Sequence, residues 1–241
     1  MIAVAWAAIP AMASAQALSC ALPVVTPVPR TTAADSAEPA RKTPVAAHTL
    51  ALSWSPQHCR ARQDGRSESF QCAGQSRFGF VLHGLWPDGA GSQWPQYCRR
   101  AGVVPPRVVR SMLCTTPSAD LMQHEWAKHG TCGWSDPAAY FTTARTLFED
   151  IRYPDMVALS RRPDLTVGAL RARFAQANRH IPGLTAEAVR VRVGNGGWLE
   201  ELWLCLDRSL AYDRCRSGQR GGAPAGQRVR IWRGRGIAPR D

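Results

Sequence analysis

The sequence predicts an α+β domain in which a small antiparallel sheet packs against several helices. Two strand patterns come first, a helical stretch fills the middle, and two further strand patterns follow, so strands flank the helices. The 8 cysteines are scattered along the 241 residues and contain no CxxC pair. An even, scattered set is typical of a disulfide framework formed in an oxidising compartment.

The first 47 residues divide into two segments that we expect to lie outside the sheet. Residues 1–17 are rich in alanine and end in small-residue cleavage patterns, which predicts a signal peptide, although no Lys or Arg precedes them. Residues 18–47 are rich in Pro, Ala and Thr and are expected to form a linker. No run reaches the roughly 18–20 apolar residues of a membrane span. We therefore expect an exported protein, periplasmic or extracellular, without a membrane partner.

The first two strands are expected at 48–54 and 78–82. The first alternates apolar and polar residues, and the second is more continuously apolar. His83 should end the second strand, because Gly84 permits a sharp turn there and Pro87 stiffens the chain beyond it.

Helices are expected in the middle of the chain, and three of the four follow a capping residue. Ser118, Asp136 and Thr166 are the expected N-caps, and Gly130 is placed to end the second helix. The expected helices span residues 105–112, 119–129, 137–151 and 167–177.

The last two strands are expected at 188–193 and 198–206, joined by a hairpin at the glycine-rich segment 194–197. The folded domain is then expected to span 48–215. Residues 216–241 form a basic tail with seven arginines and one acid, in which 229–232 is a candidate final strand.

The formal net charge is +12, which favours polyanionic partners such as RNA. A genome that favours arginine codons would also explain the bias, since the chain has 28 Arg and only two Lys. That bias draws attention to Lys128, where a compact ammonium is retained.

Four ionisable side chains lie within residues 124–129. At about 100° per helical residue, His124, Lys128, Glu125 and His129 fall on one face, while Trp126 turns toward the core. Two imidazoles and an ammonium repel each other unless an anion lies among them, and a phosphate would supply that anion. Taken singly, each residue would also fit an ordinary structural role.

A zinc site is a poorer interpretation of this helix. Zinc peptidases place two histidines at i and i+4 in HExxH, whereas here the spacing is i and i+5. Lys128 occupies the i+4 position, and its ammonium would oppose a dication. We therefore expect no metal and no other cofactor.

Two segments resemble the ribonuclease T2 family of acid ribonucleases. FVLHGLWPDG at 80–89 and HEWAKHGTC at 124–132 correspond to that family's two catalytic segments, in the same order and about 40 residues apart. The wider resemblance covers roughly 48–215 and includes LSWSPQHC and LEELWLCLD. It implies an α+β fold, single-stranded RNA as substrate and a 2′,3′-cyclic phosphate as first product.

The resemblance also implies roles for the residues that match. His129 would act as general base and His83 as general acid, His124 would hold the phosphate, and Lys128 and Glu125 would stabilise the transition state. Histidine suits both acid and base because its unperturbed pKa is near 6.5.

Three further residues are candidates for base contacts. Trp86 and Asp88 match family positions, and Trp94 is an additional candidate. Stacking on tryptophan tolerates any base, so we expect low base specificity. A buried core position for Trp86 and a simple turn acid at Asp88 are the alternatives.

The family pattern implies the disulfide Cys98–Cys132. Cys205–Cys215 and Cys59–Cys72 are expected as well, which leaves Cys20 for Cys114.

We expect the protein to be a monomer. The sequence also leaves two rival classes of function open. One is a polyanion-binding protein whose basic tail is its main function. The other is a metal-dependent nuclease or phosphodiesterase.

Overall fold

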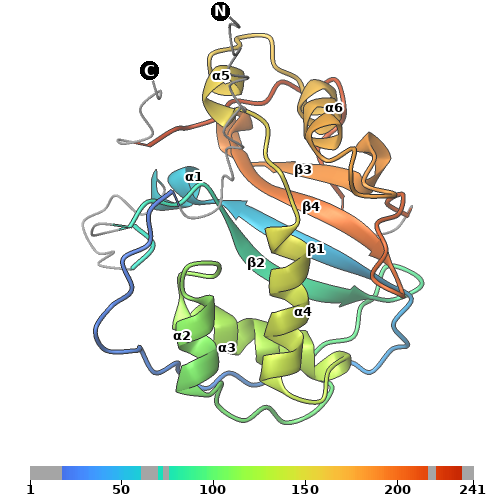
Figure 1. Ribbon diagram of the computed structural model, residues 1–241. Coiled ribbons are helices and arrows are strands. Elements are labelled where there is room, and N and C mark those ends of the chain that lie inside the picture. The colour runs from blue at the N-terminus through green and yellow to red at the C-terminus, as the bar shows by residue number, and fades with distance from the viewer. Residues whose placement is uncertain (1–17, 61–69, 73–75, 217–220, 235–241) are drawn as a thin grey trace, which may run out of the picture.

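Four antiparallel strands form the centre of the protein, which is described by a computed structural model over residues 18–60, 70–72, 76–216 and 221–234. The strands are β1 (Ala47–Trp54), β2 (Phe80–Asp88), β3 (Val189–Val193) and β4 (Leu199–Asp207). Their order in the sheet is β2-β1-β4-β3 (Figure 1). The expected α+β class is confirmed, and the expected signal peptide, 1–17, lies outside the described residues.

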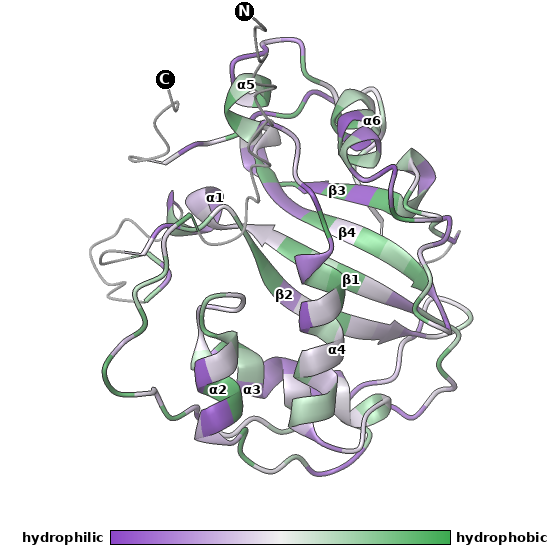
Figure 2. Cartoon of the chain, in the orientation of Figure 1, coloured by the Kyte–Doolittle hydropathy of each residue, from purple (hydrophilic) through white to green (hydrophobic). Residues whose placement is uncertain are grey.

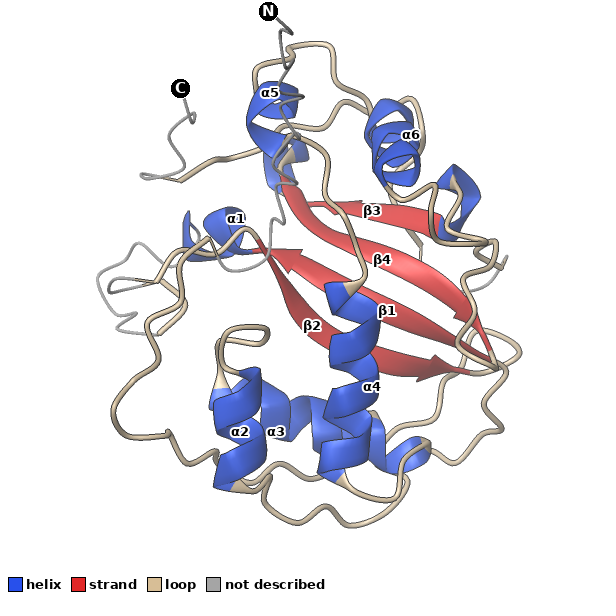
Figure 3. Cartoon of the chain, viewed as in Figure 1, coloured by secondary structure: helices blue, strands red, loops and turns tan. Residues whose placement is uncertain are grey.

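In the described residues, six α-helices accompany the sheet (Figure 3). They are α1 (Ser55–Arg60), α2 (Pro106–Met112), α3 (Ala119–Lys128), α4 (Pro137–Glu149), α5 (Met156–Ser160) and α6 (Val167–Ala177). The predicted caps Ser118, Asp136 and Thr166 each accept a backbone N–H from three residues ahead. The sequence did not predict α1 and α5, because five or six residues are too few to show a helical period. None of the described helices is long and apolar enough to cross a membrane.

The core lies between the sheet and the helices. β1 is central in the sheet and almost wholly buried, and α4 crosses in front of β1 and β2 (Figure 1). Tyr140 and Phe148 of α4 are fully buried against this face. Figure 2 shows apolar residues concentrated along the strands. The sheet is therefore a rigid support for side chains that project from β1, β2 and β4.

β2 is longer than the sequence predicted, and the expected turn after His83 is wrong. Ala51 pairs with Gly84 and Leu52 pairs with Leu82, so His83 is the extra residue of a β-bulge and the strand continues to Asp88. Pro87 is accommodated because β2 is an edge strand, where a missing N–H disturbs no neighbour. A bulge redirects the side chain of its extra residue, and such bulges are frequent beside active sites.

The segment 18–46 forms no helix or long strand, yet it contacts the domain at specific points, which differs from the expected linker. In Figure 1 its blue trace runs down one side and beneath α2 and α3 before entering β1. Arg30 pairs with Asp120 of α3 at 2.6 Å, and Arg41 exchanges backbone hydrogen bonds with Gln96. Short polar contacts, together with a disulfide from Cys20, hold a segment that has few large apolar residues.

The basic tail also differs from expectation. Val229 and Ile231 are buried in the main core, so the packed domain continues past residue 215. The candidate strand at 229–232 makes only an isolated bridge, in which Arg230 pairs with Trp198. Residues 217–220 and 235–241 lie outside the described residues.

All four expected disulfides are present: Cys20–Cys114, Cys59–Cys72, Cys98–Cys132 and Cys205–Cys215. The described residues contain no free cysteine.

Candidate active site

His83 projects from the bulge of β2 and is held by β1 and β4. Its Nδ1 lies 2.7 Å from Oε1 of Glu201, and the same oxygen accepts a 2.8 Å hydrogen bond from Ser53. The other carboxylate oxygen of Glu201 accepts from Trp203 Nε1 at 2.7 Å. Because all these groups stand on neighbouring strands, the sheet fixes the ring of His83 in one orientation.

Glu125 lies under His83 and is 1% exposed. Its Oε1 is 3.5 Å from His83 Nε2, and its Oε2 accepts a 2.7 Å hydrogen bond from Trp86 Nε1. Gly84 makes this approach possible, since a Cβ there would come within 1.9 Å of Glu125 Oε2. Gly84 is therefore needed for close packing rather than for a turn.

His129 lies against the same indole as His83. The ring centroids of Trp86 and His83 are 5.1 Å apart, and those of Trp86 and His129 are 5.6 Å apart. α3 ends at Lys128, with His129 as its C-cap, so Gly130 is not the cap. A Cβ at Gly130 would instead come within 2.4 Å of the Trp126 ring.

Lys128 and His124 lie one turn apart on α3 and face the N-terminal segment. The ammonium of Lys128 donates to Glu38 Oε1, and Tyr97 donates to Glu38 Oε2 at 3.0 Å. The ring centroid of Tyr97 is 6.5 Å from that of His124. A carboxylate therefore occupies the place beside Lys128 and His124 where the sequence analysis expected an anion.

The two carboxyl groups beside His83, those of Glu125 and Glu201, differ in their pKa values. Burial raises the pKa of Glu125 to about 7, against the opposing pull of His83, the Trp86 hydrogen bond and Lys128. Burial also acts on Glu201, but the hydrogen bonds from His83, Ser53 and Trp203 outweigh it and lower its pKa. Burial and the neighbouring Lys128 lower the pKa of His124. One carboxyl is thus near its titration point at neutral pH and the other is an anion, a contrast common at catalytic sites.

The expected face of α3 is only partly realised. His124 and Lys128 lie together, and Trp126 is buried as expected, whereas Glu125 and His129 are buried as well. The four side chains still converge on one region, because β2 brings His83 and Trp86 to the buried side of the helix.

The three candidates for base contacts occupy different settings. Trp86 is buried between the imidazoles, and Asp88 is buried and accepts a 2.6 Å hydrogen bond from Thr49. Trp94 is half-buried, donates to Gln96 and carries the guanidinium of Arg41 over its ring at 5.2 Å. Of the three, Trp94 presents the more accessible ring.

Sequence reasoning missed three residues of this cluster: Ser53, Glu201 and Glu38. Glu201 carries a usable signal, since it is an acid in an apolar strand pattern that also contains Trp203. Ser53 pairs with Glu201 across β1 and β4, which requires the register of the sheet. Glu38 is 90 residues from Lys128 and has no local signal.

The cluster combines two imidazoles that contact one indole, a buried carboxyl with a raised pKa, and an ammonium. Together, these groups form a site whose chemistry allows it to exchange protons and to hold an anion.

The chain belongs to the ribonuclease T2 family, whose family model matches residues 46–215. It is 30% identical over 187 residues to a probable ribonuclease of Haemophilus influenzae, covering 73% of this chain and 63% of that protein. It is 32% identical over 168 residues to a ribonuclease of Aeromonas hydrophila, covering 67% of this chain and 71% of that protein. Among solved structures it resembles trichomaglin, described as an S-like ribonuclease, with a TM-score of 0.57 and 20% identity over 76% of this chain and 96% of that one.

Proposed function

We propose that this protein is an endoribonuclease that cleaves single-stranded RNA by transesterification, without a metal ion. The observation that carries the proposal is the placement of His83 and His129 against one indole, Trp86, whose N–H holds the buried Glu125. Membership of the ribonuclease T2 family and the relatives named as ribonucleases support the same activity.

In the first step, His129 takes the proton from the ribose 2′-OH as that oxygen attacks the phosphorus. The bond from phosphorus to the 5′-oxygen breaks, and His83 gives that oxygen a proton. The hydrogen bond with Glu201 places the second proton of His83 on Nδ1, so Nε2 carries the transferred one. The products are a 2′,3′-cyclic phosphate and a free 5′-OH.

In the second step, water replaces the ribose oxygen and the histidines exchange roles. His83 now takes a proton from water, the bond from phosphorus to the 2′-oxygen breaks, and His129 protonates that oxygen. A 3′-phosphate remains. The cycle needs one protonated and one neutral imidazole, so the pH profile is bell-shaped.

Charge on the phosphoryl oxygens is balanced by the groups of α3. Lys128 supplies an ammonium, and His124 holds a phosphoryl oxygen beside it. Because the pKa of Glu125 is raised to about 7, this carboxyl is largely protonated in mildly acidic solution and donates a hydrogen bond. Substrate must displace the Glu38 carboxylate from Lys128 before its phosphate takes that place.

The remaining properties follow from the same site. Stacking on Trp94, with Trp86 and Asp88 as the other base-contact candidates, gives low base specificity. The disulfides fit an exported protein. We propose that it acts as a monomer.

The test is to incubate the protein in EDTA with an RNA oligonucleotide and its deoxy counterpart. Cleavage of RNA alone, leaving 2′,3′-cyclic termini, is expected. Cleavage of the DNA, or loss of RNA cleavage in EDTA, would refute the mechanism and favour a metal-dependent nuclease.

A polyanion-binding protein without catalysis is the second alternative. It predicts that His83→Ala and His129→Ala leave the protein's function intact while loss of the tail abolishes it. Deleting the whole tail is a poor test, since Val229 and Ile231 belong to the core. Replacing exposed arginines is the better one.

A further inference from the structure

A basic hollow lies at the end of the sheet where β1 finishes and β4 begins. Its volume is about 640 Å³, and it is lined by the end of α5, by Gly196 and Trp198 just before β4, and by the tail segment 228–234. The charged and aromatic side chains that line it include Arg161, Arg228, Arg230, Arg233, Trp198 and Trp232. The proposed mechanism uses none of these residues.

The hollow has a strong positive charge. Arg162 also lines the hollow and pairs with Asp164 at 3.2 Å. The carboxylate of Asp164 is a negative charge beside the site. Arg162 and Arg228 hold the pKa of Asp164 below its usual range, so this carboxylate is ionised and offsets one arginine. A surplus of guanidinium groups remains, and guanidinium forks match phosphate oxygens in geometry.

Beside the hollow, two guanidiniums lie over two indole rings and form Arg–Trp layers, while the planes of the two indoles stand at 88° to each other. The Cζ atom of Arg60 lies 4.4 Å from the Trp198 centroid and 4.3 Å from that of Trp232, and Arg230 Cζ lies 3.9 Å from the Trp198 centroid. Planar groups held in this way offer stacking surfaces for nucleobases. Such layers distinguish the hollow from a simple anion site.

Two buried donors in these layers have no acceptor within the described part of the chain. They are Nε1 of Trp232 and Nη1 of Arg60. A buried donor without a partner destabilises the folded state, and a ligand oxygen that reached it would satisfy it. The layers are therefore suited to a ligand that has both oxygens and flat rings.

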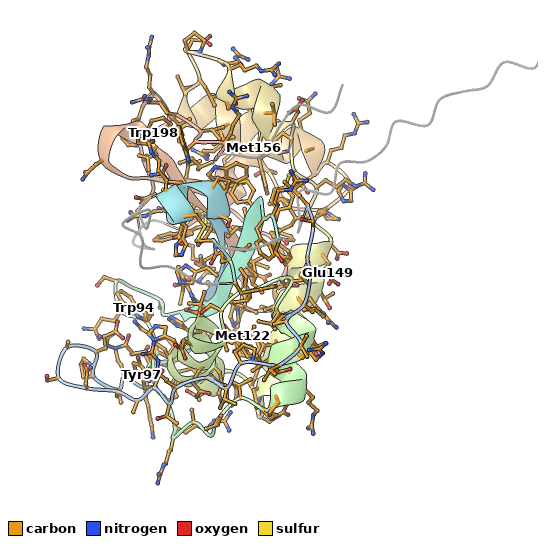
Figure 4. All side chains as sticks on the ribbon, turned by 90° about the vertical axis from the view of Figure 1, so that its left-hand side faces the viewer. Trp94, Tyr97, Met122, Glu149, Met156 and Trp198 are labelled. Carbon is orange, nitrogen blue, oxygen red and sulfur yellow. A yellow bond between two sulfur atoms is a disulfide. The ribbon has the colours of Figure 1, made fainter. Side chains whose placement is uncertain are left out.

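The hollow is connected to the catalytic cluster through the sheet. Trp54 ends β1 and donates through Nε1 to the backbone oxygen of Trp232 at 2.6 Å, while the preceding residue, Ser53, contacts Glu201. Trp198 lies three residues before Glu201, which is about 10 Å along a strand. Figure 4 shows Trp198 on the same side of the molecule as Trp94 and Tyr97, with Trp198 toward one end of that side and the other two toward the opposite end. One extended strand can pass both places.

We propose that this hollow is a second binding site for single-stranded RNA, occupied by the part of the substrate that extends beyond the scissile phosphate. The arginines bind the backbone and the Arg–Trp layers stack bases. This proposal rests on the proposed ribonuclease function for its occupant, while the site itself is tested by binding alone.

The experiment compares two double variants of the full chain. Arg161→Gln with Arg233→Gln removes two charges from the hollow. Arg107→Gln with Arg145→Gln removes the same charge from α2 and α4 and serves as the matched control. The probe is an oligodeoxythymidylate, which lacks the 2′-OH and is not cleaved, titrated at several salt concentrations.

The hollow variant should bind the probe several-fold more weakly. The slope of log affinity against log salt should fall by about 1.4, or about 0.7 for each lost phosphate contact, while the control retains its slope. With RNA, the hollow variant should lose activity on a long oligonucleotide and retain it on a dinucleotide. Inorganic polyphosphate should compete less well than the oligonucleotide, because it has no bases.

Equal loss in both variants, or no loss in either, would overturn the assignment. Equal competition by polyphosphate would reduce the hollow to an anion site and also overturn it. If wild-type protein binds the probe as described but cleaves no RNA, the proposed function fails while the binding site stands.

Discussion

Glu201 is the residue through which the sheet controls His83, and replacing it by Gln gives a quantitative test. Glu201 accepts hydrogen bonds from His83, Ser53 and Trp203 at 2.7, 2.8 and 2.7 Å. The variant keeps the size of the side chain but removes its charge. It also turns an amide N–H₂ toward one of three donors, so at least one hydrogen bond is lost.

The size of the effect follows from the contact with His83. A hydrogen bond to a charged group contributes about 1.5–3 kcal/mol, which corresponds to a roughly ten- to hundredfold loss of kcat/KM. Loss of the carboxylate makes the imidazolium less stable relative to the neutral ring. His83, the general acid, then loses its proton at a lower pH, so the alkaline limb of the pH profile moves down by about one to two pH units.

The assay is kcat/KM for a dinucleotide across the pH range, with Glu200→Gln as the control. Glu200 is exposed and adjacent in sequence, and its replacement should change neither rate nor profile. A fall in rate without movement of the alkaline limb would show that Glu201 acts through stability alone. An unchanged rate would refute the positioning role altogether.

Three further changes test other parts of the account. Gly84→Ala should destabilise the protein by about 1–3 kcal/mol in urea unfolding, since its Cβ would meet Glu125 Oε2, and an unchanged midpoint would contradict this contact. The pKa of Glu125 is raised from 4.5 to about 7, so it contributes stability below pH 4.5 that is lost as pH rises through 7. Relative to Glu125→Gln, the wild-type free energy of unfolding should therefore fall by about 3 kcal/mol across that window, and a flat difference would count against it. Glu38→Gln should lower KM for RNA roughly two- to fivefold by releasing Lys128, and a raised KM would show that Glu38 helps binding instead.

The sequence predictions that proved correct depend on local features of the chain. The N-caps Ser118, Asp136 and Thr166 act within three residues of themselves, so they could be read from the chain directly. The hairpin at 194–197 needs left-handed backbone, which Gly196 and Gly197 adopt with φ of 72° and 75°. Such features depend on steric rules that hold in any context.

Features that depend on pairing across the fold were missed. A glycine after a histidine fits a turn as well as a bulge, and the register of β1 against β2 decides between them. The helical angle placed Glu125 on one face with His124 and Lys128 and did not show its burial, which depends on the Trp86 N–H that β2 supplies. The segment 18–46 lacked the apolar residues of a core, and its contacts with Asp120 and Lys128 are long-range polar ones.

The most direct test of the central claim uses a DNA oligonucleotide that contains a single ribonucleotide. In EDTA the protein should cut it only on the 3′ side of that ribose and leave a 2′,3′-cyclic phosphate, and His83→Ala and His129→Ala should each abolish the cut. Cleavage at any other position, or cleavage that requires an added metal ion, would contradict the proposed mechanism.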